Sequence, residues 1–507
     1  MKKVNQLKVG ALLSYISLGL TNIISIIYTP IMLRLLGQSE YGLYTLSNSI
    51  IGYLGVLDFG LGNAIVRYTA KYRAEKNSDA ESNLNGLFII VYSIIAMIVS
   101  MVGGALILNI DSLFSETLSI EEISRMKILM ILMIFNLAIS LPGGIFGSII
   151  TAYERFIFPK VLGIIRAILN PFIMLPLLLM GYKSVGMTIA TTVINIVYII
   201  VNMYYCFHIL KIKVRFKRLD FSILKEIIGY SFFVFLGMIV DKIYWSTDQF
   251  ILGAVQGTTV VAIYAVGSTF NAYYMNFSTA ISGVFLPKVT KMVTEKASEK
   301  ELSDLFIKVG RIQFIVMSFI LGGFLLVGKN FINLWAGEGY NDAYYIAIIV
   351  MIPLTIPLIQ NMGLTILYAK NKQKFRSNVY IAIAILNVML SIPLGKAFGG
   401  IGCALATSFA MLLGNIIIIN IYYYKKIHID IPDFWRNICK MSIPVIISVV
   451  IGAMAKYIII TNGLVAVLAV GLIFTVIFIP LMWFMGMNNY EKELFILPIR
   501  KIVKKYS

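Results

Sequence analysis

Charged residues are scarce in this chain. They make up 13% of its 507 residues, whereas a soluble globular domain carries about 25%. Hydrophobic residues make up 59%, and the mean hydropathy is +0.87. This composition excludes an ordinary water-soluble protein and favours one that lies largely in a membrane.

Residues of the kinds that build metal, redox or nucleotide sites are also few. The three cysteines, Cys206, Cys403 and Cys439, stand singly in or beside apolar runs, so we expect small packing residues and no disulfide framework or zinc site. His208 and His428 are too far apart in sequence to indicate a metal site. The chain has no Walker A sequence, so nothing in it indicates ATP hydrolysis.

Long apolar runs are abundant instead. A helix needs about 20 apolar residues to cross about 30 Å of hydrocarbon. We predict an all-α polytopic membrane protein of about fourteen such helices, with no room for a water-soluble catalytic domain. The first run is too long for a signal peptide and lacks its small-residue cleavage site, so we expect it to remain as a helix. The runs begin near residues 11, 42, 84, 127, 161, 184, 226, 258, 310, 343, 378, 400, 439 and 463.

The net charge of +19 indicates how the chain is oriented in the membrane. Fourteen spans place both termini on one side, and the connections alternate between two sets. One set, with both termini, holds 34 of the 43 Lys and Arg residues, the other holds 7, and Arg166 and Lys242 lie inside spans. The positive-inside rule makes the basic set cytoplasmic, so nucleic acid is not needed as a partner. The segment 211–218, KIKVRFKR, is expected to attract anionic lipid head groups.

The two halves of the chain repeat each other. Residues 168–170, ILN, return as residues 385–387, and the pattern at 185–192, VGMTIATT, returns as IGCALATS at 401–408. The offset of about 217 residues covers six helices, an even number, so the halves are parallel repeats. Such halves commonly enclose a central site and rock about it in alternating access. We expect an N-lobe (1–222), a C-lobe (223–437) and two further helices with a basic cytoplasmic tail (438–507).

Two stretches near the start carry a family resemblance. They are LGQSEYGLY at 36–44 and LDFGLGNAIVRY at 57–68, where Asp-x-Gly-Leu-x5-Arg-Tyr is the more specific pattern. With two six-helix lobes plus two helices, the chain resembles the MOP (multidrug/oligosaccharidyl-lipid/polysaccharide) exporter superfamily. Within it, the chain looks like the polysaccharide-transporter branch of Wzx-like flippases.

The resemblance implies a transporter in the bacterial cytoplasmic membrane rather than an enzyme. Its substrate would be an oligosaccharide linked to a polyprenyl pyrophosphate such as undecaprenyl pyrophosphate, moved from the cytoplasmic to the outer leaflet for cell-surface polysaccharide synthesis. A polysaccharide polymerase and glycosyltransferases would be partners. No cofactor is implied apart from coupling to a proton or sodium gradient.

Ionisable side chains inside a membrane are costly and therefore point to function. Arg presents a planar fork that matches phosphate oxygens, so Arg34, Arg67 and Arg166, with Lys242, are predicted to attract the pyrophosphate. For Arg34 and Arg67 the alternative is that they snorkel to the nearby interface. Arg166 has Ile383 at the equivalent position of the other half, which favours function over scaffold.

Three acidic residues are candidates for ion coupling. Asp58 lies near Gly60 and Gly62, so its alternative role is a hydrogen bond that distorts the helix. Asp241 and Asp248 are seven residues apart and share a helix face. They would exchange a proton or cation, or else balance arginines across the cavity, and the sequence favours neither.

Polar contacts to the sugars are expected from Gln360 and Asn361. One alternative function is a multidrug or cation antiporter of the MATE type, which would need an acidic cavity rather than one with three arginines. The other is a membrane polysaccharide polymerase, which would need a sizeable loop or an Asp-x-Asp motif. We find neither in the sequence.

Overall fold

A computed structural model describes residues 6–216, 221–283, 285–458, 463–494 and 496–497. Within these ranges the chain is helical and forms no strand. It divides into two compact units, Met1–Ala262 and Ile263–Ser507, which we describe separately as unit 1 and unit 2. The three-part division at 222 and 437 that the repeat suggests stays a prediction.

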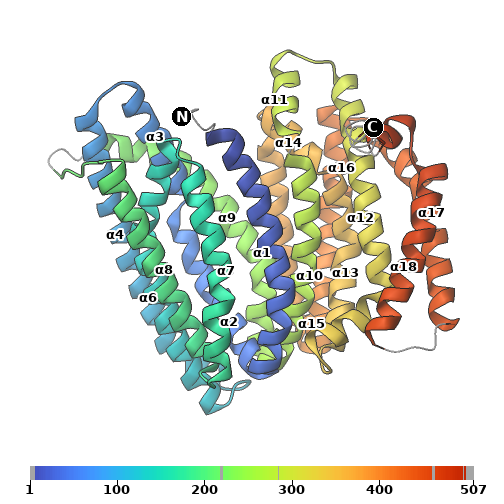
Figure 1. Ribbon diagram of the computed structural model, residues 1–507, viewed down its shortest axis with the longest axis horizontal. Helices are drawn as coiled ribbons and strands as arrows, with labels where there is room; N and C mark the ends of the chain where they lie inside the picture. The colour runs from blue at the N-terminus through green and yellow to red at the C-terminus, as the bar shows by residue number, and fades with distance from the viewer. Residues whose placement is uncertain (1–5, 217–220, 284, 459–462, 495, 498–507) are drawn as a thin grey trace, which may run out of the picture. The chain divides into compact units, whose positions relative to one another are not determined.

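Unit 1 consists of long helices joined by short turns (Figure 1). Helix α4 packs on α6, α6 on α8, and α1 on α7, while α2 packs on α6 and α9. The elements are α1 Gln6–Leu36, α2 Gln38–Gly55, η1 Val56–Asp58, α3 Leu61–Ala74, α4 Ser78–Leu108, α5 Ile110–Phe114, α6 Ile120–Ala152, α7 Ile157–Leu179, α8 Lys183–Tyr204, η2 Tyr205–Ile209 and α9 Phe221–Val255. Helix α10, Thr258–Gly283, begins in unit 1 and continues into unit 2.

Unit 2 is built in the same way. Helix α12 packs on α13, α17 and α18, and α13 packs on α15. The elements are α11 Leu286–Thr294, α12 Glu299–Ala336, α13 Asn341–Ile359, α14 Asn361–Ala369, α15 Gln373–Met411, η3 Leu412–Ile418, α16 Ile419–Tyr422, η4 Tyr423–Ile427, α17 Ile431–Ile458, α18 Leu464–Leu481 and η5 Met482–Gly486.

The described residues include 11 helices that are long and apolar enough to cross a membrane. One of them runs for 55 residues, from Gln373 to Ile427, and contains two of the predicted runs. Helices α9 and α10, outside these 11, contain two more. The all-α, multi-pass class predicted from the sequence is confirmed, and the elements are consistent with about fourteen spans.

Two breaks shape these long helices. Between α2 and α3 the backbone enters the left-handed region at Phe59 (φ 54°) and Gly60 (φ 66°), so a short 3₁₀ turn separates two helices within one crossing. Inside α15, Gly399 has φ 57° and ψ −137°, a conformation that L side chains rarely adopt. Glycine at this position therefore allows α15 to turn back between its two crossings.

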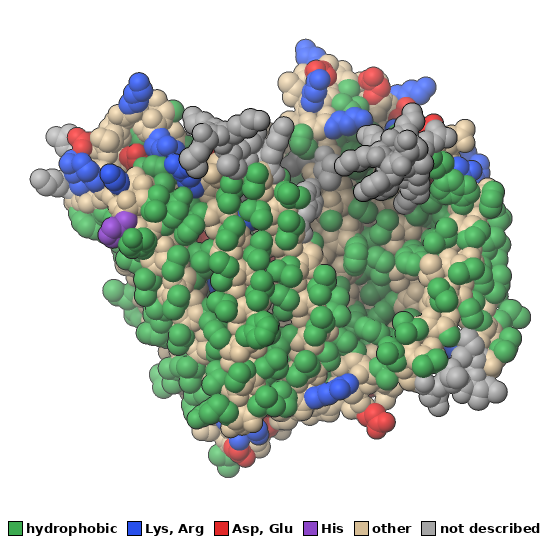
Figure 2. All heavy atoms as spheres, in the orientation of Figure 1, with side chains coloured by type: hydrophobic (Ala, Val, Ile, Leu, Met, Phe, Trp, Pro, Cys, Tyr) green, Lys and Arg blue, Asp and Glu red, His purple; other side chains and the backbone are tan. Residues whose placement is uncertain are grey.

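Apolar side chains cover much of the outer surface. Figure 2 shows them over the middle of the visible face, with charged side chains gathered toward the ends of the helices. Large apolar residues such as Met101, Phe172 and Val476 are more than half exposed. Such a belt is unfavourable in water and is accounted for by lipid. Of the cysteines, Cys206 and Cys403 are buried as expected, but Cys439 is exposed because it lies on the outer face of α17.

Candidate functional site

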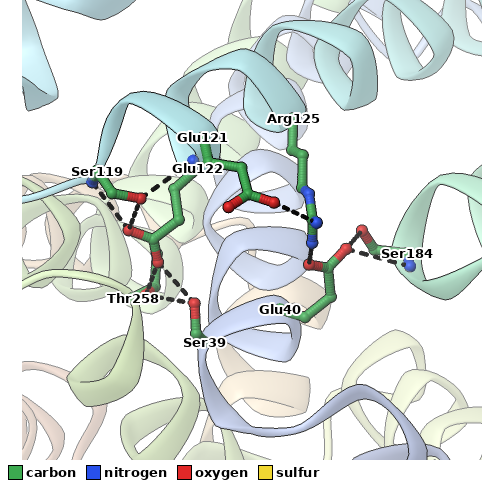
Figure 3. Close-up of polar contacts among 8 residues, drawn as sticks. All are labelled: Ser39, Glu40, Ser119, Glu121, Glu122, Arg125, Ser184 and Thr258. Carbon is green, nitrogen blue, oxygen red and sulfur yellow. Dashed lines mark hydrogen bonds and ion pairs between the residues drawn. The ribbon is translucent and has the colours of Figure 1, made fainter.

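A polar junction at one end of unit 1 is built by the motif at 36–44 (Figure 3). Glu40, in the first turn of α2, is 7% exposed. Its carboxylate accepts a charged hydrogen bond from Arg125 Nη1 of α6 at 2.7 Å, and bonds from the Ser184 hydroxyl and backbone N–H at the start of α8. Arg125 also pairs with Glu121. One buried carboxylate thus joins three helix starts, and we call this end of unit 1 the Glu40 end.

A second carboxylate extends this junction. Glu122 forms a capping box with Ser119, in which each side chain bonds the other residue's backbone N–H, and this fixes the start of α6. The free face of its carboxylate accepts hydrogen bonds from Ser39 Oγ at 2.6 Å and Thr258 Oγ1 at 2.7 Å. The starts of α2, α6 and α10 are therefore held by Glu122, as Figure 3 shows.

The close packing of α2 against α10 requires a glycine at position 42. A Cβ built on Gly42 would stand 1.8 Å from the carbonyl oxygen of Thr258, far inside van der Waals contact. Only a glycine lets α2 approach the backbone of α10 so closely. The motif that carries the family resemblance is thus, in this structure, the helix-packing junction of the Glu40 end.

The opposite end of unit 1 has its own junction. Tyr153, just past α6, donates a hydrogen bond to Glu81 Oε1 of α4 at 2.6 Å. Arg73, at the end of α3, lies over the Tyr153 ring at 3.7 Å and donates to the Ala152 carbonyl at 2.9 Å. Burial, and then the bond to Glu81, raise the pKa of Tyr153. We call this the Glu81 end.

Between the two ends, polar groups meet where α2 packs on α9. The Tyr53 hydroxyl lies against Thr247 Oγ1 and donates to the Lys242 carbonyl at 3.4 Å. Asp248, only 2% exposed, is close enough to act electrostatically on Tyr53. A Cβ at Gly52 would stand 3.0 Å from Lys242 Nζ, so the ammonium group occupies space that this glycine leaves open. Tyr53 lies about 22 Å along α2 from its start, at 1.5 Å per residue, so the group lies well inside the 37-residue candidate span Gln38–Ala74. We call Gly52, Tyr53, Lys242, Thr247 and Asp248 the α2–α9 cluster.

The acidic candidates occupy different surroundings. Asp58 lies in η1 at the break between α2 and α3, and its carboxylate has the Tyr92 hydroxyl of α4 and the backbone of Gly60 as hydrogen-bonding partners. Asp248 is buried in the α2–α9 cluster, whereas Asp241, two turns earlier on α9, is exposed. The structure therefore brings Lys242 and Asp248 into one cluster and places Asp58 beyond it along the same crossing.

Each of two predicted arginines lies against an aromatic ring. The Arg166 guanidinium of α7 lies 5.3 Å from the centre of the Tyr198 ring of α8, and that of Arg67 lies 5.8 Å from the ring of Tyr68. The side chain of Arg67 is exposed, and that of Arg166 is partly exposed. Among the described residues neither guanidinium has a hydrogen bond or ion pair, so its N–H groups are available to an anion.

The arginines lie at different depths. Helices α1 and α7 run side by side in the same direction, because the Ile157 N–H donates to Gln6 at the start of both and Tyr28 donates to Met174 farther along. Arg34 lies six residues beyond Tyr28, and Arg166 lies eight residues before Met174. The two arginines are therefore 14 residues, or about 21 Å, apart along the helix axes. They therefore do not form one cluster but stand at two levels of the membrane.

In unit 2, Gln360 and Asn361 lie at the break between α13 and α14. The side-chain amides of Gln360 and Asn420 bond each other, with Nε2 to Oδ1 at 2.8 Å, and Trp435 Nε1 donates to the same Asn420 oxygen. Asn361 donates to Ser282 at 3.2 Å. Both predicted residues line a cavity of about 40 Å³, room for one or a few waters. Other lining residues include Arg376 and Asn415.

Several polar residues escaped the sequence analysis. Glu40 and Arg125 are far apart in sequence, so no local pattern pairs them, although the Ser119-x-x-Glu122 capping box was readable. In unit 2, Arg311 of α12 is buried and makes a two-pronged ion pair with Glu491, bonding Asn437 and the Gly486 carbonyl as well. No group of three or more His, Cys, Asp or Glu side chains is arranged to hold a metal ion in the described ranges.

Residues 7–293 match a family described as polysaccharide biosynthesis protein. Over 393 residues, the chain is 19% identical to a putative O-antigen transporter of Shigella flexneri, covering 76% of this chain and 90% of that protein. The fold is similar to the lipid II flippase MurJ in an inward closed conformation, with a TM-score of 0.74, 18% identity, and coverage of 93% and 98% of the two chains. It is also similar to an inward-facing MATE family transporter of the MOP superfamily, with a TM-score of 0.62, 15% identity, and coverage of 78% and 92%.

Proposed function

Because the chain belongs to the polysaccharide biosynthesis protein family, we propose that it moves an oligosaccharide linked to a polyprenyl pyrophosphate from the cytoplasmic to the outer leaflet. It is a multi-pass membrane transporter of the MOP fold and not an enzyme. The protein would lie in a bacterial cytoplasmic membrane with both termini inside. The Glu81 end of unit 1 would then face the cytoplasm.

One observation carries the choice of substrate. Cationic side chains stand at successive levels of the membrane-spanning helices of unit 1. Distances along the helices give these levels. Arg67 lies about 9 Å from Arg73, and Arg166 lies about 14 Å from the start of α7, both measured from the Glu81 end. Lys242 lies about 20 Å from the end of α9, measured from the Glu40 end. Arg34 lies two residues from the end of α1. A pyrophosphate would meet a cation at each level, where low dielectric strengthens its binding.

The polar groups of unit 2 supply the second part of the proposal. Gln360 and Asn361 carry amides at a helix break, where sugar hydroxyls would replace their present partners, Asn420 and Ser282, once the small cavity widens during transport. The polyprenyl chain needs no site of its own, since it is as apolar as the lipid around it. The two halves would expose the site alternately to the two sides of the membrane. Glycosyltransferases would act before transport and a polymerase after it.

Coupling to a proton or sodium gradient is proposed for the three aspartates. Asp58, with its tyrosine partner at a helix break, and Asp248, buried near Tyr53, are carboxylates whose charge would be altered by a proton or a cation. Asp241 lies on the same helix and is exposed.

A MATE-type antiporter is the second candidate, favoured by the similar fold. Organic cations require an acidic cavity, whereas the candidate cations on the helices of unit 1, Arg34, Arg67, Arg166 and Lys242, outnumber its three candidate aspartates. We therefore favour the anionic, lipid-linked substrate.

The proposal is tested by depleting the protein and locating the lipid-linked oligosaccharide with an impermeant probe, in everted and right-side-out vesicles. Accumulation on the cytoplasmic face, relieved by re-expression, is expected. Oligosaccharide that reaches the outer face at the normal rate would contradict the proposal.

A further inference from the structure

A surface cavity of unit 2 lies at the turn between η4 and α17, away from Gln360 and Asn361. Its volume is about 750 Å³, within the range of small-ligand sites. Basic side chains line it from both elements: Lys425 from η4, His428 just after it, and Arg436 from the second turn of α17. Each of these three side chains is exposed.

Two carboxylates also line the cavity, but both are bound by the first turns of α17. Asp430 Oδ1 accepts from the Asp433 backbone N–H at 2.9 Å, which caps the helix. Asp433 accepts from Asn437 Nδ2 at 3.3 Å and lies 3.9 Å from Arg436. Lys425 and His428 have no hydrogen bond or ion pair within the described ranges. The cavity therefore offers the Lys425 ammonium and a His428 ring that the described residues leave without a partner, which is typical of a site for an anion.

Apolar stripes run from this cavity along both helices. On one side, Ile417, Ile421 and Tyr424 follow at spacings of four and three residues, and each exposes about half of its surface. On the other, Ile443 and Val450 follow Arg436 at intervals of seven residues, two helical turns, and are exposed to the same degree. The elements are joined near the cavity by the bond from Trp435 to Asn420.

We propose that this cavity binds the phosphate headgroup of an anionic phospholipid, whose acyl chains lie along the two apolar stripes. The cations match the phosphate, and the stripes continue into the hydrocarbon at the depth where acyl chains begin. A free phosphate would satisfy the cations but leave the stripes unused. The inference concerns a structural lipid and does not depend on the substrate or direction of transport.

The test is lipid binding to the purified full chain in detergent, counted by native mass spectrometry with phosphatidylglycerol and with zwitterionic phosphatidylcholine. The double variant Lys425→Gln/Arg436→Gln is compared with Lys300→Gln/Lys374→Gln, an equal charge change at exposed residues outside the cavity. Each basic group contributes about 1 kcal/mol near anionic lipid, and 1.4 kcal/mol is tenfold, so we expect about thirty-fold weaker phosphatidylglycerol binding in the first variant only. Equal binding by both variants would overturn the proposal.

A second measurement uses the wild-type chain. Cys439, three residues after Arg436, is the exposed one of the three cysteines, so a thiol-reactive fluorophore will label it selectively. Brominated phosphatidylglycerol is expected to quench the label more strongly than brominated phosphatidylcholine, and millimolar inorganic phosphate should not relieve the quenching. Equal quenching by both lipids, or full relief by inorganic phosphate, would rule out the lipid headgroup.

Discussion

Arg125 of α6 donates to the buried carboxylate of Glu40 on α2 across 2.7 Å, and this pair anchors the Glu40 end of unit 1. Arg125→Ala would leave a buried carboxylate without its cation. We expect a loss of about 1.5–3 kcal/mol in the free energy of unfolding, the range for a hydrogen bond to a charged group, because Ser184 still donates to the carboxylate. Thermal unfolding of the purified protein in detergent measures this loss.

The control for Arg125 is on the same helix. Lys127 pairs with Asp111, but both side chains are substantially exposed, so Lys127→Ala should cost less than about 1 kcal/mol. Adding Glu40→Gln to Arg125→Ala should recover part of the stability, because no charge then remains buried. Equal stability of the Arg125 and Lys127 variants would refute the anchoring role.

Gly42→Ala tests the close approach of α2 to Thr258. Its new methyl would meet the Thr258 carbonyl oxygen, so α10 must shift, at about 1–3 kcal/mol for overpacking. Gly55→Ala, also in α2, has open space around it and should be neutral or slightly stabilising. The comparison uses the melting temperature of each variant. A Gly42 variant as stable as the Gly55 variant would show that the junction tolerates displacement.

Arg166→Ala is expected to lower export at least tenfold while leaving membrane insertion intact. The physical reason is the loss of a guanidinium that lies against Tyr198 with its donors free for pyrophosphate. Lys160→Ala, at the start of the same helix, is the control and should export normally. Export is followed as outer-leaflet oligosaccharide, at matched protein levels in membranes. Normal export by the Arg166 variant would remove this residue from the site.

Lys242→Gln removes the cation that fills the space at Gly52. Because the amide is neutral and only one bond shorter, the α2–α9 contact should largely persist while transport falls at least tenfold. Lys242→Arg, which keeps the charge, should retain more activity than the Gln variant. If the Gln variant transports as well as the wild type, the α2–α9 cluster serves packing alone.

Asp58→Asn keeps the size and hydrogen bonding at the η1 break but removes the charge. We expect the dependence of transport on a proton or sodium gradient to change, measured in vesicles with imposed gradients. Asp304→Asn, at an exposed position near the start of α12, removes the same charge without touching Asp58 and should leave that dependence unaltered. An unchanged ion response in the Asp58 variant would remove Asp58 from coupling.

The sequence predicted the helices better than the contacts between them. Apolar runs are local features, so the all-α class followed directly from them, and Gly60 made a disturbed helix one of the two alternatives for Asp58. The Glu40–Arg125 and Arg311–Glu491 pairs join residues 85 and 180 positions apart, and only the packed structure brings them together. The depth of each arginine also depends on packing, because Arg34 and Arg166 are separated by the parallel run of α1 and α7. Cys439 was misjudged because an apolar neighbourhood in sequence does not distinguish a buried face from one toward lipid.

The most direct test of the central claim is reconstitution of the purified chain into liposomes that carry polyprenyl-pyrophosphate-linked oligosaccharide. An impermeant sugar-modifying reagent then measures how fast inner-leaflet lipid becomes accessible. The account predicts rapid access with the wild type, and slow access both with the Arg166→Ala/Lys242→Gln variant and in protein-free liposomes. Access no faster with the wild type than in protein-free liposomes, under either imposed gradient, would contradict it.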